Sequence, residues 1–246
     1  MIRRAILVLL LLGTQLPLCG QDRYGRPSGD TYNTSFNFKQ IIVPTVLVGA
    51  GSLGLLDAYK KDVNIPIKDY MSDIRGNCYI HADDYIQYIP IASTLLLCLD
   101  KGKREGWQEK IALAATGSAI TWMLVTSLKY AVGETRPDSS RNNSFPSGHT
   151  ATSFLGAELV RLEYGNYWGA AAYAIAATTG FLRMYNERHW SNDVLAGAGI
   201  GILSAKIAYW LLPWEKRQLG KLNFLPYFAP DSEGNSSAGL ALSYTF

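Results

Sequence analysis

The chain has 246 residues, of which 48% are hydrophobic and 17% charged, so it is long enough for one large domain and more apolar than an average soluble domain. Its formal net charge of +3 is too small to indicate nucleic acid as a partner, and none is expected. The cysteines Cys19, Cys78 and Cys98 match no metal-ligand spacing and no disulfide framework, so the redox compartment has to be inferred from targeting signals.

The first 20 residues have the layout of a signal peptide. Two arginines precede an apolar run over residues 5–12, and small and polar residues follow it. We therefore expect residues 1–20 to be a signal peptide and residues 21–40 to be a separate N-terminal segment. An uncleaved first membrane anchor is the alternative. Lipidation of Cys19 is disfavoured because Leu18 stands where a lipoprotein site has a small residue.

Six apolar stretches follow. They lie at residues 41–56, 85–99, 111–132, 149–162, 167–185 and 194–212. Several are rich in alanine and glycine, which suits close helix packing inside a bilayer, and the third, fifth and sixth approach the ~20 residues that a spanning helix needs. Aromatic residues gather at the ends of the later stretches, as in an interfacial belt. Residues 41–214 are thus predicted to form an all-α, six-helix, membrane-associated bundle, with an all-α soluble core as the alternative.

The tail, residues 220–246, has a different pattern. The segments "LNFLPYFAPD" and "GLALSYTF" alternate with a period of two, and the Gly/Ser/Asn-rich "SEGNSS" lies between them. This pattern predicts a C-terminal β-hairpin. An aromatic C-terminus on such a strand resembles the ends of outer-membrane barrels, but one hairpin cannot close a barrel, so we expect an accessory element.

Two cations precede the stretch "SFPSGHTATSF". Lys129 and Arg136 are seven positions apart, almost two helical turns, and share a face if the helix persists. Pro137 disfavours helix for the residue before it, so the helix is expected to end there, with both cations at the negative end of its dipole. The plainest interpretation of the stretch itself is a loop followed by a helix with a Ser N-cap at Ser147, which places His149 in the first turn.

Three further polar residues follow in "RMYNERHWSND". His189 and Asp193 are four positions apart, within reach of each other on one helical turn, and Arg183 precedes them. The remaining histidine, His81, lies in the acidic segment "HADDY" and is interpreted as a surface residue. Taken singly, each group also has a structural interpretation, because terminal cations often snorkel and a His–Asp pair can simply hold a fold together.

Taken together, these groups are suited to one reaction, the transfer of a phosphoryl group. Fixed cations, a serine hydroxyl and backbone N–H groups at a helix N-terminus can cradle a phosphate dianion. A neutral imidazole that Asp193 holds by one ring nitrogen keeps its other lone pair free for attack, and a second, protonated histidine can give a proton to the leaving oxygen. Phosphoryl transfer needs mainly such positioning and charge stabilisation. No carboxylate or Cys/His cluster accompanies the cradle, so we expect no metal and no cofactor.

The pattern K-x6-RP, then PSGH, then R-x5-H-x3-D, over residues 129–193, resembles the three-part signature of the type 2 phosphatidic acid phosphatase (PAP2) family, and the surrounding helices fit that family's six-helix core. The resemblance implies that His189 is the nucleophile that forms a phosphohistidine, that Asp193 orients it, and that His149 is the general acid. It also implies a phosphate-binding set, namely Lys129, Arg136, Ser147, Gly148 and Arg183. Leu182 departs from the family pattern, which has serine there, and removes at most one auxiliary hydrogen bond.

Basic residues outside the motif predict the orientation. Four lie in residues 100–110 and three in residues 216–221, and the positive-inside rule puts both groups in the cytoplasm, so that the motif faces outward. A cleaved signal peptide followed by full crossings at 41–56 and 85–99 conflicts with this. Either one of these segments does not span, 41–56 being the first candidate, or the N-terminal segment stays uncleaved. The expected location is a bacterial inner membrane, with the site facing the periplasm.

A membrane-embedded, outward-facing site of this type implies that the substrate is a lipid phosphate in the bilayer. The candidates are lipid A phosphate, undecaprenyl diphosphate, phosphatidylglycerol phosphate and phosphatidic acid, and the export signal and barrel-like tail favour the first two. The alternatives are a soluble secreted acid phosphatase of broad specificity, a vanadium haloperoxidase and an inactive membrane scaffold. The sequence predicts no particular oligomeric state.

Overall fold

The computed structural model describes residues 36–96, 107–219, 222–230 and 236–244, and the expected signal segment at residues 1–20 lies outside them. In chain order the helices are α2 (Lys39–Leu53), α3 (Asp57–Tyr59), the π-helix η1 (Lys60–Asn64), α4 (Ile65–Arg75), α5 (Asp83–Ile86), α6 (Ile89–Leu96), α7 (Trp107–Val132), α8 (Gly148–Tyr164), α9 (Asn166–Tyr185) and α10 (Ser191–Leu219). The strands are β1 (Leu222–Pro230) and β2 (Ser236–Tyr244). The described part of the domain is helical, as the all-α prediction requires.

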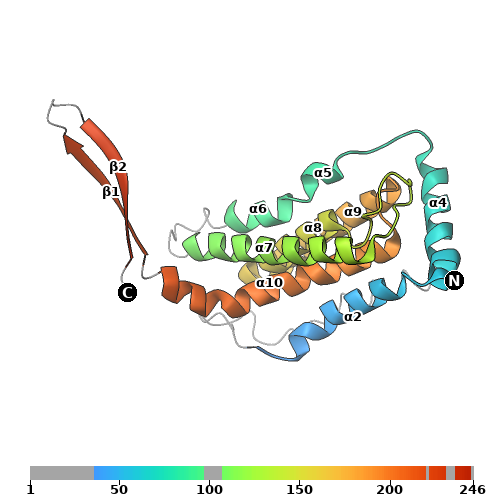
Figure 1. Ribbon diagram of the computed structural model, residues 1–246, viewed down its shortest axis with the longest axis horizontal. Helices are drawn as coiled ribbons and strands as arrows, with labels where there is room; N and C mark the ends of the chain where they lie inside the picture. The colour runs from blue at the N-terminus through green and yellow to red at the C-terminus, as the bar shows by residue number, and fades with distance from the viewer. Residues whose placement is uncertain (1–35, 97–106, 220–221, 231–235, 245–246) are drawn as a thin grey trace.

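Six helices form the bundle, and they match the six apolar stretches of the sequence. They are α2, α6, α7, α8, α9 and α10, which lie along one another in Figure 1. The central helix is α8, which packs against α6, α7, α9 and α10. Its residues Ala151, Leu155 and Leu159 are fully buried. The predicted six-helix bundle is therefore confirmed.

Glycines allow the central helices to approach closely. A Cβ added to Gly201 of α10 would lie 2.2 Å from the carbonyl oxygen of Ala151, and one added to Gly156 of α8 would lie 2.3 Å from the backbone nitrogen of Ile91. No side chain fits at either contact. The backbone of α8 is thus packed directly against those of α6 and α10.

Among the described residues, two helices are long and apolar enough to cross a membrane, at Glu109–Val132 of α7 and Ser191–Trp214 of α10. The helix α2 counts as a candidate span only when it is combined with the following helical segment, Asp57–Arg75, and the two segments are bent by 84° relative to each other. The helix α9 has 20 residues, but it is not among the helices that meet the joint requirement of length and composition for a span. Length alone therefore overestimates how well α9 suits a span.

The helix α2 packs antiparallel to α10. Near its start, Trp210 Nε1 donates a hydrogen bond to Gln40 Oε1 at 3.0 Å. Just past its end, Gly54 lies against the side chain of Asn192, at the start of α10. The helix α2 therefore runs toward the end of the bundle where α8 and α10 begin, and α4 then lies across that end (Figure 1).

A charged cluster is buried between α8, α9 and α10. Glu158 is 1% exposed and accepts hydrogen bonds from Arg161, from Lys206 at 2.6 Å and from Tyr173 at 2.6 Å. Both carboxylate oxygens have donors, so the buried charge is compensated. This explains how the predicted stretch 149–162 carries a carboxylate inside an apolar bundle.

The strands β1 and β2 pair antiparallel at the far end of α10. The register runs from Leu222 opposite Tyr244 to Pro230 opposite Ser236. The pair projects from the end of the bundle opposite the start of α10 (Figure 1). The role of this pair as an accessory stays a prediction.

Candidate active site

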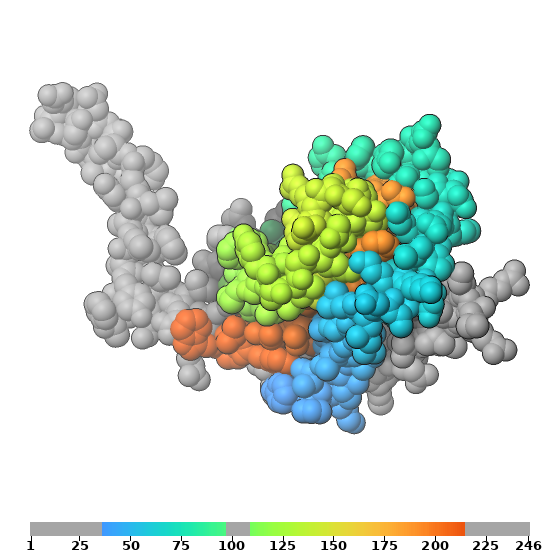
Figure 2. All heavy atoms as spheres, turned by 45° about the vertical axis from the view of Figure 1, so that its right-hand side comes forward, coloured from blue at the N-terminus to red at the C-terminus, as the bar shows by residue number. Residues whose placement is uncertain are grey.

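Four helix ends converge at one end of the bundle. The helices α7 and α9 end there, and α8 and α10 begin there (Figure 1). In Figure 2, the loop after α7 lies close to the segment around α4, and orange residues from the region of the α10 start are visible between them. The backbone N–H of Ser147 donates to the carbonyl oxygen of Asp193 at 3.0 Å, which ties the beginning of α8 to that of α10. Residues 46 positions apart in the sequence are thereby brought together.

His189 and Asp193 lie at the centre of this junction. His189 Nδ1 is 3.4 Å from Asp193 Oδ2, and His189 is 3% exposed. The same carboxylate oxygen accepts hydrogen bonds from Ser144 Oγ at 2.5 Å and from the backbone N–H of Trp190 at 2.8 Å. These two donors fix Asp193, so the carboxylate is held ready to orient the ring.

His149 lies in the first turn of α8, and its partner is an acidic residue from α5. Its Nε2 is 3.0 Å from Asp84 Oδ1, and its side chain is 29% exposed. The sequence interpretation made His81, in the acidic segment "HADDY", a surface residue, and His81 is indeed exposed. It missed Asp83 and Asp84, which face the site from that segment.

The three predicted cations are held by oxygens of the protein. Lys129 Nζ donates to the carbonyl oxygen of Asn143 at 2.5 Å, and Arg136 Nε donates to the Asn143 side chain at 3.0 Å. Arg183 Nη1 lies 2.5 Å from Asp83 Oδ2 and 3.5 Å from Asp84 Oδ1. Its Nε is buried and has no hydrogen-bond partner within the described structure. A phosphate oxygen would supply the acceptor that this N–H lacks.

Ser147 and Gly148 have structural explanations of their own. Ser147 is the N-cap of α8, and its hydroxyl oxygen accepts hydrogen bonds from Thr150 N at 3.5 Å and Thr150 Oγ1 at 2.9 Å. A Cβ on Gly148 would lie 3.6 Å from Val125, an ordinary contact, so close packing does not require glycine there. The roles of these two residues in binding phosphate stay predictions.

The electrostatics of the site favour a neutral His189. Burial, and then the positive charge of Arg183, hold the pKa of His189 well below its ordinary value. Burial and Arg183 also lower the pKa of His149, although the hydrogen bond to Asp84 opposes this effect. A neutral, buried imidazole next to cations is suited to attack phosphorus.

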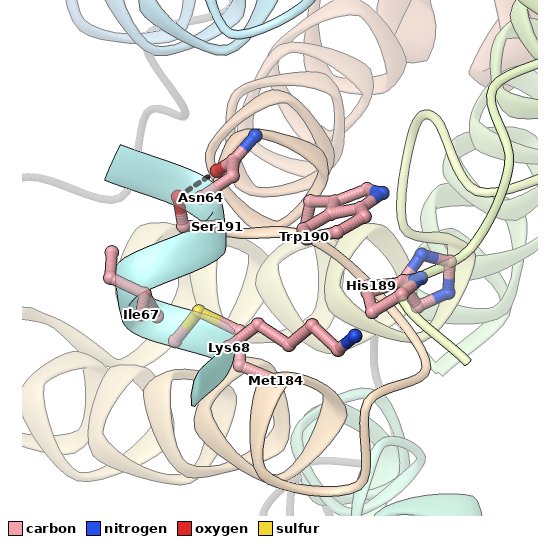
Figure 3. A pocket seen from close by; sticks show the side chains of 8 residues that line it. Asn64, Ile67, Lys68, Met184, His189, Trp190 and Ser191 are labelled. Carbon is pink, nitrogen blue, oxygen red and sulfur yellow. Dashed lines mark hydrogen bonds between the residues drawn. The ribbon is translucent and has the colours of Figure 1, made fainter. Parts of the chain in front are cut away.

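A narrow pocket borders His189 on the side of α4. It is lined by Asn64, Ile67, Lys68, Pro137, Met184, His189, Trp190 and Ser191. Figure 3 shows Lys68 extending its amine toward the His189 side of this pocket. Within the part of the chain that the structure describes, no group of three or more His, Cys, Asp or Glu side chains is placed to hold a metal ion.

Residues 110–217 match the family model described as PAP2 superfamily. This match includes the whole three-part motif at residues 129–193 and so agrees with the resemblance that the motif predicts. The matched region lies within the helical bundle described above, which contains both helices that are long and apolar enough to cross a membrane.

Two curated relatives and one solved structure resemble the chain. A lipid A 1-phosphatase of Porphyromonas gingivalis is 38% identical over 141 residues, 55% of this chain and 32% of that protein. The bacitracin transport permease protein BcrC of Bacillus licheniformis is 37% identical over 75 residues, 29% of this chain and 35% of that protein. The chain thus spans about a third of the length of these curated relatives. The crystal structure of Aquifex aeolicus LpxE aligns with a TM-score of 0.49 and 22% identity, over 59% of this chain and 94% of that chain.

Proposed function

We propose that the chain is a phosphatase that hydrolyses a lipid phosphate, of the lipid A phosphate or undecaprenyl diphosphate class, through a phosphohistidine. The observation that carries this proposal is the buried His189, which Asp193 holds at a junction where Lys129, Arg136 and Arg183 converge. The similarity to a lipid A 1-phosphatase supports the substrate class. The apolar α7 and α10 favour a lipid over a soluble phosphomonoester as the substrate.

In the first step, His189 Nε2 attacks phosphorus while Asp193 holds Nδ1 and stabilises the positive charge that develops on the ring. The bond from phosphorus to the leaving oxygen breaks, and His149 gives its proton to that oxygen. Before substrate binds, Asp84 orients His149 Nε2 at 3.0 Å. The leaving oxygen then takes the place of Asp84 as the partner of the N–H.

In the second step, water attacks the phosphorus of the phosphohistidine. His149, now neutral, takes a proton from this water, and the nitrogen–phosphorus bond breaks. Inorganic phosphate leaves and His189 returns to its neutral form. Throughout, Lys129, Arg136 and Arg183 offset the charge on the phosphoryl oxygens, which is the main electrostatic requirement of phosphoryl transfer.

We further propose that the site faces the periplasm from a bacterial inner membrane. The helix α7 begins and α10 ends at the end of the bundle opposite the site, so Lys110 of α7 and positions 216 and 217 of α10 belong to that end. The positive-inside rule assigns it to the cytoplasm. Since α2 starts beside Trp210, on the same side, this orientation favours an N-terminal segment that is not exported.

The experiment is phosphate release by the purified full-length protein in lipid vesicles that contain lipid A phosphate, undecaprenyl diphosphate, phosphatidylglycerol phosphate or phosphatidic acid. We expect the fastest release from one of the first two, and no release by His189→Ala. The matched control is His81→Asn, because His81 is exposed and lies outside the junction. No release from any of the four lipids, or full release by His189→Ala, would contradict the proposal.

A further inference from the structure

Within the described part of the chain, three buried polar atoms without hydrogen-bond partners belong to side chains that interact with one another. They are Glu134 Oε2, Asn192 Nδ2 and Asp193 Oδ1. Glu134 interacts with both Asn192 and Asp193, which places the three atoms in one cluster. A buried polar atom without a partner is costly, so this cluster points to a hydrogen bond that the heavy atoms alone do not reveal.

The cluster contains two carboxyl groups in contact. The side chains of Glu134 and Asp193 are 7% and 0% exposed, and the two groups are within hydrogen-bonding reach of each other. Two buried carboxylates at such a separation cannot both be ionised, so the pair keeps one proton. That proton is the missing donor, because it satisfies one oxygen of each group.

The surroundings decide which group carries the proton. The other oxygen of Asp193 faces three N–H or O–H donors, on Ser144, Trp190 and His189, which stabilise its ionised form. On Glu134, the ionised form is favoured by Lys60 Nζ, at the longer distance of 3.7 Å from Oε1, and by the Asn192 amide, whose Nδ2 makes no hydrogen bond of normal geometry within the described structure. Asp193 is therefore the better anion and Glu134 the better acid.

We propose that Glu134 is a protonated carboxylic acid that donates its O–H to Asp193 Oδ1 and so acts as a positioning residue behind the His189–Asp193 pair. The inference rests on the proposed function, in which His189 is the nucleophile. Glu134 lies between the Lys and the Arg of the sequence motif but is not part of it. The backbone carbonyl oxygen of Glu134 accepts a hydrogen bond from the N–H of Ser144 at 2.8 Å, and the hydroxyl of Ser144 donates to Asp193. Ser144 therefore links the backbone of Glu134 to the Asp193 carboxylate.

The donated hydrogen bond fixes the plane of the Asp193 carboxylate and keeps its charge in place as His189 becomes cationic. Burial, and then the negative charge of Asp193, raise the pKa of Glu134 to about 8, while Lys60 opposes this. A raised pKa means that Glu134 contributes stability that is fully present below its unfolded value and is lost as the pH rises through about 8. The same loss of the proton removes the donor from Asp193, so turnover should fall over the same range.

The kinetic test compares wild type with Glu134→Gln and Glu134→Ala in the vesicle assay. Glutamine keeps the shape and donates an N–H at every pH, so it should rescue most of the turnover and should not show the alkaline fall near pH 8. Alanine leaves Asp193 Oδ1 without a donor and should lower kcat roughly tenfold at neutral pH, with little change in KM. If Glu134 had only a structural role, turnover would fall near pH 8 in both wild type and Glu134→Gln, and that result would overturn the proposal.

A second measurement needs no substrate. The infrared difference spectrum of wild type minus Glu134→Gln should contain the C=O band of a protonated carboxylic acid at neutral pH, and the band should disappear as the pH rises past about 8. Absence of the band at neutral pH would show that both groups are ionised and would refute the inference. If the band is present but wild type releases no phosphate from any lipid, the shared proton stands and the proposed function fails.

Discussion

Replacing Asp193 with asparagine isolates the electrostatic part of the proposed mechanism. Asparagine keeps the shape of the side chain, so its carbonyl oxygen can still accept from Ser144 and Trp190. It removes the negative charge 3.4 Å from His189 Nδ1. Two unit charges at that distance attract by about 5 kcal/mol with an effective dielectric constant of about 20.

The expected loss of rate follows from this attraction. If about half of the charge on the His189 ring has developed in the transition state, Asp193→Asn raises the barrier by about 2–3 kcal/mol. Loss of the preferred ring tautomer adds to this, so phosphoenzyme formation should slow by roughly 10²–10³-fold. The affinity for inorganic phosphate should change little, because the three cations are untouched.

The assay is rapid-quench trapping of acid-labile phosphoenzyme from radiolabelled substrate, together with inhibition by inorganic phosphate. The matched control is Asp73→Asn, an exposed carboxylate on α4. Phosphoenzyme formation at the wild-type rate in Asp193→Asn would refute the electrostatic reasoning. Equal losses of phosphate affinity and of rate would show instead that Asp193 mainly holds the cradle together.

Three further predictions test the site and its orientation. His189→Ala should abolish phosphoenzyme formation. His149→Ala should slow turnover of an alkyl phosphate by roughly 10²–10⁴-fold, and an aryl phosphate, whose leaving group needs less protonation, should partly rescue it. Rapid-quench trapping in both variants distinguishes the two roles, and a phosphoenzyme that forms in His189→Ala but not in His149→Ala would show that the roles of the two histidines are reversed. Vanadate should inhibit, because in the cradle it can adopt a five-coordinate geometry like that of the transition state. EDTA should not inhibit, because no metal-ligand cluster accompanies the cradle among the described residues. Phosphate release with each reagent checks this, and a loss in EDTA that a metal restores would count against the site. Periplasmic reporters should work when fused in residues 138–145 and cytoplasmic reporters in residues 100–110, and the opposite pattern would place the substrate in the inner leaflet.

The sequence predicts the bundle and the core of the site because both depend on local patterns. Each apolar stretch is long enough to define one helix, so all six bundle helices lie where the stretches predict them. The His189–Asp193 contact follows from a spacing of four residues, although His189 itself lies just before α10 begins. The expected helix end at Pro137 is wrong by several residues, because α7 already ends at Val132, where Gly133 follows with a φ of 62°; Arg136 therefore lies in the loop and does not share a helical face with Lys129.

The partners that the sequence does not reveal come from segments that only the tertiary packing brings together. Asp83 and Arg183 are 100 positions apart, and their contact depends on how α5 sits on the end of α9. Glu134 and Ser144 lie in a loop with no periodic pattern, so no spacing rule predicts that both meet Asp193. The acidic pair in "HADDY" was the available signal, since adjacent carboxylates close to a cationic motif in an apolar protein need compensating partners.

On the proposed mechanism, the charges around the cradle explain the state of His149. Asp83 and Asp84 offset the charge of Arg183 before phosphate arrives, at 2.5 Å and 3.5 Å. Burial and Arg183 nevertheless hold the pKa of His149 below its ordinary value, so the free enzyme has less of the protonated acid than an ordinary histidine would provide. A phosphate dianion places two negative charges beside the same ring and raises its proton affinity. The substrate therefore generates its own general acid, and Asp84 serves to keep the imidazole oriented until the leaving oxygen replaces it.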